Sequence, residues 1–86
     1  MFVMISYLLL SVPLKHCEEI AIALRNIKEI KEVAGLYGEM DLLVKIEAQG
    51  NRQLDRIMLD IIRKYKQIEN SRTYVVIGDI YWKKEK

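Results

Sequence analysis

The sequence is poor in the residues that build covalent cross-links and metal sites. It holds one cysteine, Cys17, and one histidine, His16, among 86 residues. A lone cysteine cannot form a disulfide within the chain, and such usage is typical of a reducing, cytoplasmic setting. No CxxC, HExxH or Cys/His cluster occurs, so we expect neither a metal nor another cofactor. His16 and Cys17 are adjacent on a predicted helix, where neighbouring side chains diverge, so we expect a solvated His16 and an inert Cys17 on the core face.

Long apolar runs and an excess of one charge are also missing. The apolar segment at the N-terminus, MFVMISYLLLSVPLK, is shorter than the roughly 20 residues of a membrane-spanning helix, and it lacks the basic start of a signal peptide. The 14 basic and 12 acidic residues are interspersed and give a net charge of +2. That balance indicates neither a nucleic-acid nor an anionic membrane partner. Abundant Ile, Lys, Glu and Arg are compatible with a thermophilic source.

Motifs for phosphate binding, nucleic-acid recognition and catalysis are absent as well. Neither G-x-x-x-x-G-K-[ST] nor G-x-G-x-x-G occurs, and no RNP-like run of glycine and phenylalanine is present. A helix-turn-helix needs helices before the first strand, whereas this chain starts with a strand pattern. Glu39 and Asp41 are two close carboxylates, but turns accept Asp and Glu readily. We therefore predict no direct DNA binding and no enzymatic activity.

The first half of the chain alternates between strand and helix patterns. Residues 2–12 are rich in β-branched, aromatic and leucine residues, which predicts a strand, and Pro13 follows in the connection. From about Lys15 the period becomes helical, with one apolar stripe made of Cys17, Ile20, Ala21, Leu24 and Ile27. Residues 31–37 and 41–48 read as two further strands, and the short GEM segment between them predicts a hairpin connection.

The second half repeats the strand–helix–strand pattern that the first half begins. Asn51 is the expected N-cap of a second helix, whose apolar stripe is Leu54, Ile57, Met58, Ile61, Ile62 and Tyr65. Residues 71–82 predict a long last strand, and residues 83–86 form a charged tail after a domain that spans residues 1–82. The order βαββαβ predicts an α+β, ferredoxin-like fold. Right-handed crossovers place both helices on one face of a four-stranded antiparallel sheet.

The predicted sheet is apolar on both of its faces. The first strand carries Val3, Ile5, Tyr7 and Leu9 on one face, with Phe2, Met4, Leu8 and Leu10 on the other. The last strand alternates in the same way, with Val75, Ile77 and Tyr81 on one face and Tyr74, Val76, Ile80 and Trp82 on the other. Two helices on one side cannot cover both faces, and a soluble monomer rarely exposes so large an apolar patch. We therefore predict a homodimer that packs sheet on sheet, as in a dimeric α/β barrel.

The hairpin and the segment after it resemble a known family. EVAGLYGEMDLLVKIEA followed by NRQLDRIMLDIIRKYKQIENSRTYVVI resembles the effector-binding RAM domain of the Lrp/AsnC transcriptional regulators, over residues 2–77. That family typically has a V…G-x-[Y/F]-D hairpin, a leucine near the start of the next helix and a T-x-T segment opening the last strand. Met40 stands where an aromatic residue is usual, and Ser71 replaces the first threonine. The matching residues here are Val33, Gly38, Glu39, Met40, Asp41, Leu54, Ser71 and Thr73.

The resemblance implies a free amino acid as effector, bound where dimers meet in a higher assembly, commonly a tetramer of dimers. Gly38 can adopt a positive φ and let backbone N–H groups approach a ligand carboxylate, and Asp41 can accept hydrogen bonds from the ligand ammonium. The expected protein is a stand-alone RAM domain that modulates transcription indirectly, through assembly with full-length Lrp-like regulators. The implied ligand-binding residues are Tyr37, Gly38, Glu39, Met40, Asp41, Ser71 and Thr73.

Several alternatives stay open at this point. Gly38 can merely shape the turn, Asp41 can cap its backbone, and Thr73 can simply favour a strand. The domain can also be a structural oligomerisation module without a ligand of its own. ACT domains and dimeric α/β-barrel oxygenases share the topology, and a fold does not determine function. ACT domains usually use a glycine in the first strand–helix connection, but SVPLKHCEE has none, and the one histidine lies near the first helix turn rather than under the sheet.

Overall fold

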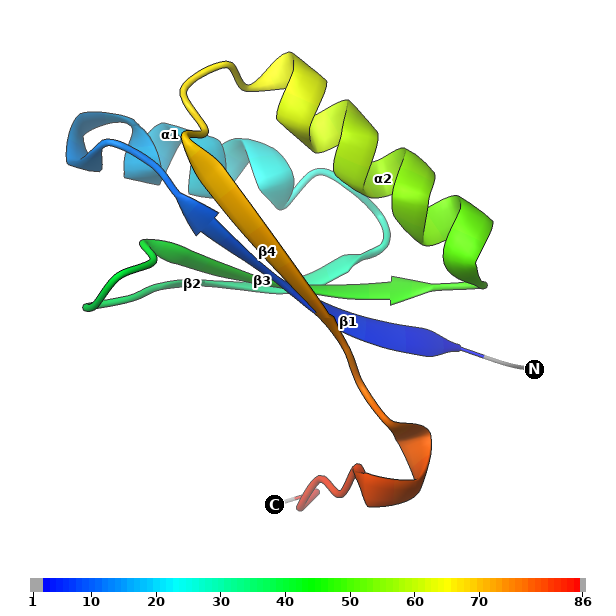
Figure 1. The fold of residues 1–86 in the computed structure, drawn as a ribbon. Helices are drawn as coiled ribbons and strands as arrows, with labels where there is room; N and C mark the ends of the chain where they lie inside the picture. Colours follow the sequence, from blue (N-terminus) through cyan, green and yellow to red (C-terminus); the bar gives the residue numbers. More distant parts are fainter. Residues whose placement is uncertain (1–2, 86) are drawn as a thin grey trace.

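The computed structural model describes residues 3–85, and its fold is the predicted ferredoxin-like α+β arrangement. One antiparallel sheet has the strand order β2-β3-β1-β4, and both helices lie on one of its faces (Figure 1). Phe2, where the predicted first strand begins, lies outside the described residues, as do Met1 and Lys86 at the outer ends of the predicted domain and tail. The elements are β1 (Met4–Ser11), α1 (Leu14–Leu24), β2 (Ile30–Gly35), β3 (Leu42–Ala48), α2 (Asn51–Lys64), β4 (Asn70–Val75) and a 3₁₀ turn, η1 (Gly78–Ile80).

The core lies between the helices and the two central strands, β1 and β3. Alternate residues of β1 point toward the helices, and they pair in register with alternate residues of β3, as Leu8 does with Val44. Because the period of a strand is two, this register brings one apolar row from each strand under the same helices. The buried apolar residues are Leu8, Leu10, Val12, Ile20, Leu24, Ile30, Leu42, Val44, Ile46, Ala48, Leu54, Ile57 and Ile61.

Both helices form where the apolar stripes predict them, but their ends differ from prediction. Asn51 is the first residue of α2 rather than its N-cap, which is Gly50. The reason is that Gly50 has φ 152°, a conformation that favours glycine, so the turn into the helix is completed one residue early. Helix α1 stops at Leu24 because the next N–H groups bond three residues back, as Ile27 does to the Leu24 carbonyl at 3.1 Å. Among residues 3–85, no helix is long and apolar enough to cross a membrane.

The predicted last strand, 71–82, is too long. Strand β4 ends at Val75, although the Val76 N–H still donates to the Ile5 carbonyl at 2.8 Å. If the register continued, Ile77 would lie opposite Met4, the first residue of β1, so later residues would have no partner strand. The chain instead bends at η1 and runs on the side of the sheet away from the helices (Figure 1). The alternating faces predicted for residues 77–82 are therefore wrong, because apolar alternation without a neighbouring strand does not make a sheet.

The sheet face opposite the helices is apolar in β1, as predicted, and mixed in its neighbours. We call it the open face. Paired residues of antiparallel strands share a face, so the register assigns its members. Lys45, Glu47 and Arg72 interrupt the apolar residues, so the face is less apolar than the sequence suggested. In β1, β3 and β4 the open face consists of Ile5, Tyr7, Leu9, Leu43, Lys45, Glu47, Arg72 and Tyr74.

Candidate functional site

Five of the seven predicted ligand-binding residues lie in one loop, residues 36–41, between β2 and β3. The loop is longer than the predicted hairpin because β2 ends at Gly35 and β3 begins at Leu42. A backbone bond from the Leu36 N–H to the Asp41 carbonyl closes it at 2.8 Å. Gly38 has φ 136°, which other L-residues rarely adopt. The backbone conformation of the loop therefore favours glycine at this position, whether or not a ligand binds.

Asp41 ties the loop to the end of β1. Its backbone N–H donates to the Leu10 carbonyl, and its Oδ2 accepts a hydrogen bond from the Val12 N–H, both at 2.8 Å. A carboxylate offers about four acceptor positions, so the bond from Val12 uses only part of the capacity of Asp41. The carboxylate thus has a structural partner that the sequence did not indicate, and it retains acceptor capacity for a cationic group.

A shallow hollow lies between this loop and the start of α1. Its volume is about 280 Å³, and Asp41 contributes the one carboxylate in its lining. Tyr37 stands at the edge of the hollow with its side chain fully exposed, so solvent reaches it freely. The hollow can hold a small ligand with a cationic group near an apolar part. The remaining lining residues are Leu14, Cys17, Gly35, Leu36 and Leu42.

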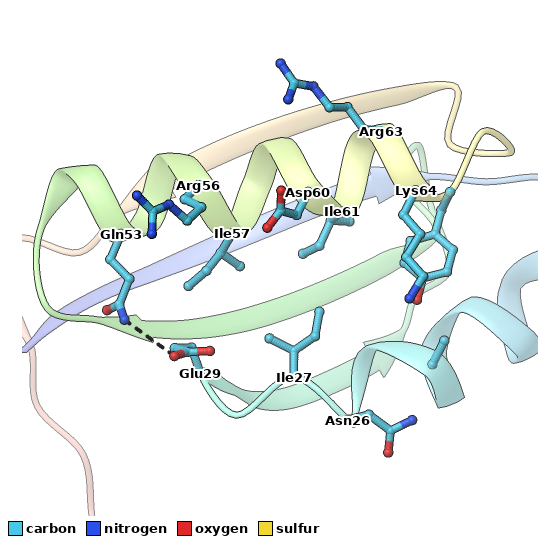
Figure 2. Close-up of a pocket in the computed structure, with 12 residues that line it drawn as sticks. Asn26, Ile27, Glu29, Gln53, Arg56, Ile57, Asp60, Ile61, Arg63 and Lys64 are labelled. Carbon is cyan, nitrogen blue, oxygen red and sulfur yellow. Dashed lines mark hydrogen bonds between the residues drawn. The ribbon is translucent and has the colours of Figure 1, made fainter.

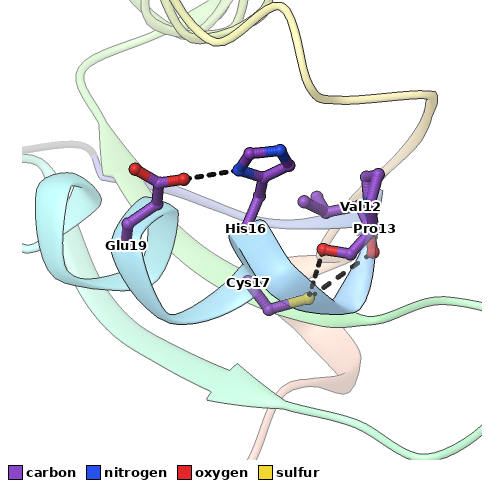
Figure 3. Close-up of polar contacts among 5 residues, drawn as sticks. All are labelled: Val12, Pro13, His16, Cys17 and Glu19. Atoms are coloured by element: carbon purple, nitrogen blue, oxygen red, sulfur yellow. Dashed lines mark hydrogen bonds and ion pairs between the residues drawn. The ribbon is translucent and has the colours of Figure 1, made fainter.

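Cys17 faces this hollow from α1 and is held in its thiol form (Figure 3). The Sγ–H donates to the carbonyls of Val12 and Pro13, at 3.5 and 3.6 Å. Burial raises the pKa of the Cys17 thiol, and the nearby Asp41 charge raises it further. A thiol with a raised pKa is a poor nucleophile, which agrees with the predicted inert role.

His16 points away from Cys17, as predicted for adjacent helix positions (Figure 3). Its Nδ1 lies 2.5 Å from Oε1 of Glu19, one helical turn further along. The imidazole has a carboxylate partner on the exposed surface of the helix, which agrees with the expected solvated position. The pair lies on the exposed side of α1 and contributes nothing to the hollow.

Ser71 and Thr73 lie on β4, across β1 from the loop. Ser71 pairs with Leu10, whose carbonyl accepts from Asp41 on the other side, so Ser71 and Asp41 are two strand spacings apart, about 10 Å. Thr73 lies further along the sheet and faces α2, where its Oγ1 is 3.0 Å from Sδ of Met58. Within one chain the structure brings Ser71 to the same end of the sheet as the loop but does not bring Thr73 there.

A wider groove, which the sequence did not indicate, lies between the end of α1 and α2 (Figure 2). Its volume is about 910 Å³, with Ile27, Ile57 and Ile61 contributing apolar walls. Charges of both signs surround it, and Gln53 Nε2 lies 3.4 Å from Glu29 Oε2 across one end. Asn26, Ile27 and Glu29 line the groove from the connection after α1, and this helix ends at Leu24, earlier than its apolar stripe predicts. Within residues 3–85, no group of three or more His, Cys, Asp or Glu side chains could hold a metal ion.

Comparison with known proteins identifies the family of this chain. The family described as "Lrp/AsnC ligand binding domain" matches residues 5–84. The proline dehydrogenase transcriptional activator of Rhizobium radiobacter is 30% identical over 66 residues, which are 77% of this chain. Those residues are only 42% of the activator, so the chain spans less than half the length of that relative.

Solved structures share the fold. A hypothetical protein from Pyrococcus horikoshii, PHS023, is 30% identical with a TM-score of 0.80, and the match covers 88% of this chain and 90% of that one. A transcriptional regulator from Neisseria meningitidis, solved as a complex with L-Met, has a TM-score of 0.79 at 17% identity. That match covers 92% of this chain and 53% of the regulator.

Proposed function

This chain belongs to the Lrp/AsnC ligand binding domain family, and we propose that it is a non-enzymatic regulatory module that senses a free amino acid. The named relatives support a regulatory role, because one is a transcriptional activator and another a transcriptional regulator. The complex of the Neisseria meningitidis regulator with L-Met supports an amino acid as the class of ligand. The loop of residues 36–41, with Gly38 at positive φ and Asp41 beside the hollow, is the observation that carries the proposal.

The chemistry of the loop suits an amino acid. An α-ammonium can donate to the acceptor positions of Asp41 that the Val12 N–H leaves available, in a charge-assisted bond. Backbone N–H groups around Gly38 can approach the α-carboxylate closely because no side chain intervenes. The apolar lining of the hollow, which includes Tyr37, would contact the ligand side chain, and Met40 of the same loop is proposed to contact it as well. Glu39 completes the proposed ligand-binding loop.

The proposed site is completed by a neighbouring subunit. The hollow is shallow and Tyr37 is fully exposed, so one chain encloses little of a ligand. Ser71 and Thr73 are proposed to supply hydroxyls at this site, although the Thr73 hydroxyl contacts Met58 in the isolated chain. A ligand held between dimers would stabilise the higher assembly by mass action. We therefore propose that ligand binding is reported by a change in assembly, and that the assembly is a tetramer of dimers.

The open face supports a homodimer as the unit of that assembly. Ile5, Tyr7 and Leu9 place apolar groups on a face that the helices of the same chain cannot reach. Sheets that pack face to face bury such rows at a spacing of about 10 Å. The same face would let the domain pair with full-length Lrp-like regulators, and this is the proposed route by which it modulates transcription.

Calorimetry against the twenty amino acids at millimolar concentration tests the proposal. We expect at least one amino acid to bind, and we expect Asp41→Asn to weaken it, because the amide keeps an acceptor for the Val12 N–H but loses the charge that attracts the ammonium. Asp55→Asn is the matched control, since Asp55 is exposed on α2, away from the loop and the open face. If no amino acid binds to demonstrably folded protein, the sensing role is wrong. The alternative is then a structural oligomerisation module without its own ligand, and pull-downs with full-length regulators would test it.

A further inference from the structure

The wide groove beside α2 has an apolar floor and charged walls. The floor consists of Ile57 and Ile61, both buried, and of the half-buried Ile27 from the connection after α1. The groove follows α2 from Gln53 to Lys64, which is about 16 Å, or about three helical turns, at a rise of about 1.5 Å per residue. Its length therefore suits a short helix that lies along α2.

One wall of the groove is a row of charged side chains on α2. Arg56, Asp60 and Lys64 lie at positions i, i+4 and i+8, so they follow one another along the groove at intervals of about 6 Å. The order of their charges is positive, negative, positive. Arg63 also borders the groove, but its side chain points away from it (Figure 2). The row therefore presents one defined charge pattern to whatever occupies the groove.

The charges of this row form no ion pair within the chain. Asp60 stands between two basic residues of the same helix, yet the one ion pair within residues 3–85 joins His16 to Glu19. Lys64 makes a cation–π contact with the Tyr65 ring, whose centre lies 5.7 Å from its Nζ. All three members of the row are exposed, so an incoming molecule can pair with them without breaking an ion pair inside the chain.

A second copy of this chain does not complement the row. The order positive, negative, positive is the same in both directions, so two antiparallel copies of α2 would place Asp60 against Asp60 and Arg56 against Lys64. Like charges that face each other disfavour an interface. Neither α1 nor α2 carries the complementary order, acidic, basic, acidic, at i, i+4 and i+8. The charge pattern therefore points to a helix of a different protein.

We propose that the wide groove binds an amphipathic helix of another protein, about three turns long, whose flank carries an acidic, a basic and an acidic residue at i, i+4 and i+8. The apolar side chains of that helix pack on Ile27, Ile57 and Ile61. The alkyl stems of Arg56 and Lys64 extend the apolar floor, while their charged ends pair with the two acidic residues.

This inference goes beyond the proposed function, because it uses neither the ligand loop nor the open face. The groove lies on the side of the sheet that carries the helices (Figure 1). A chain that is paired with a second copy through its open face therefore still presents the groove to the partner helix.

Two synthetic helical peptides of identical composition test the charge pattern. Both carry leucines at i, i+4 and i+7; one presents Glu-Lys-Glu beside them, and the other presents Lys-Glu-Lys there, with the exchanged charges on its far face. In titrations up to millimolar concentration, we expect the Glu-Lys-Glu peptide to bind at least about tenfold more tightly and to shift the NMR signals of the Ile27, Ile57 and Ile61 methyl groups. Equal binding of the two peptides, or binding of neither, would overturn the proposal.

Reversing the charges of the row provides the second test. A variant that combines Arg56→Glu, Asp60→Lys and Lys64→Glu should prefer the Lys-Glu-Lys peptide, and unfolding cannot produce such a gain. If this variant keeps the preference of the wild type, the proposal is wrong.

A single substitution keeps the test decisive even if circular dichroism shows that the triple variant does not fold. Asp60→Lys should weaken binding of the Glu-Lys-Glu peptide at least about threefold, because attraction at the centre of the row becomes repulsion. Asp55→Lys is the matched control, since Asp55 is exposed on α2 outside the groove. Equal effects of the two substitutions on binding would refute the role of the row.

Discussion

Replacing Asp41 with alanine tests whether the proposed ligand loop is built on a structural carboxylate. The Asp41 Oδ2 accepts from the Val12 N–H at 2.8 Å, and 29 positions separate the two residues in the chain. Val12 is 2% exposed, so water cannot readily replace the lost acceptor. The substitution leaves a buried N–H without a partner and loosens the junction between β1 and the loop.

The cost follows from that unpaired N–H. Leaving a buried donor unsatisfied costs about 1–3 kcal/mol, a large share of the roughly 5–15 kcal/mol that stabilises a small domain. For a domain of this size, each kcal/mol lowers Tm by about 4–8 °C. Urea denaturation followed by circular dichroism measures the free energy of unfolding directly. Asp41→Asn should cost less than Asp41→Ala, because the amide oxygen still accepts from Val12.

Cys17 gives a second, independent readout of the same variants. The Asp41 charge contributes to raising the pKa of the Cys17 thiol, so both substitutions should lower that pKa toward its ordinary value. The rate of thiol modification as a function of pH should then shift to lower pH in both variants. The reasoning would be refuted if Asp41→Ala unfolded within about 0.5 kcal/mol of the wild type, the usual range for surface substitutions.

The remaining predictions concern the core and alkaline pH. Ile61→Ala should cost about 2–5 kcal/mol because Ile61 lies on the buried face of α2, whereas Leu59→Ala on the exposed side of the same helix should change the unfolding free energy by less than about 0.5 kcal/mol; equal losses would mean that the buried face of α2 is misassigned. Ser6→Ala should be neutral or stabilising in urea denaturation, because the buried Ser6 Oγ has no hydrogen-bond partner among residues 3–85, and a clear loss would show a partner. Burial, and next the Asp41 charge, raise the pKa of Cys17 above its ordinary value of 9.0, so the unfolded thiol ionises first and its contribution to stability is present below pH 9.0 and falls as pH rises through the raised native pKa. Cys17→Ala should flatten that part of the stability profile, and an unchanged profile would exclude the thiol as its cause.

The periodicity of apolar residues predicted the helices and strands that bury one regular face. The stripe of α2 and the alternation of β1 identified the buried residues Leu54, Ile61 and Leu8, because a regular element buries one face regardless of its exact ends. The ends were less predictable. Gly50 displaced Asn51 from the cap of α2 through its backbone conformation. Residues 78–82 continue an alternation typical of a strand, yet β1 has no residues left to pair with them.

In the loop of residues 36–41, the features set by neighbouring residues were predictable, and those set by residues distant in the chain were not. A glycine before two acidic residues predicted a turn with positive φ, and Gly38 has it. The bond between Asp41 and the Val12 N–H could not be predicted, because it joins residues that only the sheet brings together. The same holds for Lys45 and Tyr81, whose contact depends on the bend at η1. The wide groove is lined in part by residues of the connection after α1, and the apolar stripe did not predict that this helix ends at Leu24.

The place of β1 in the sheet also affects how the chain is made. Residues 42–48 complete its backbone bonds on one side and residues 70–75 on the other. During synthesis this apolar strand is translated before both of its partner strands, and such distant pairing slows folding. Until then its edges are open to other nascent chains. The yield of folded protein in a cell should therefore depend on chaperones and on translation speed more than on the stability of the finished domain.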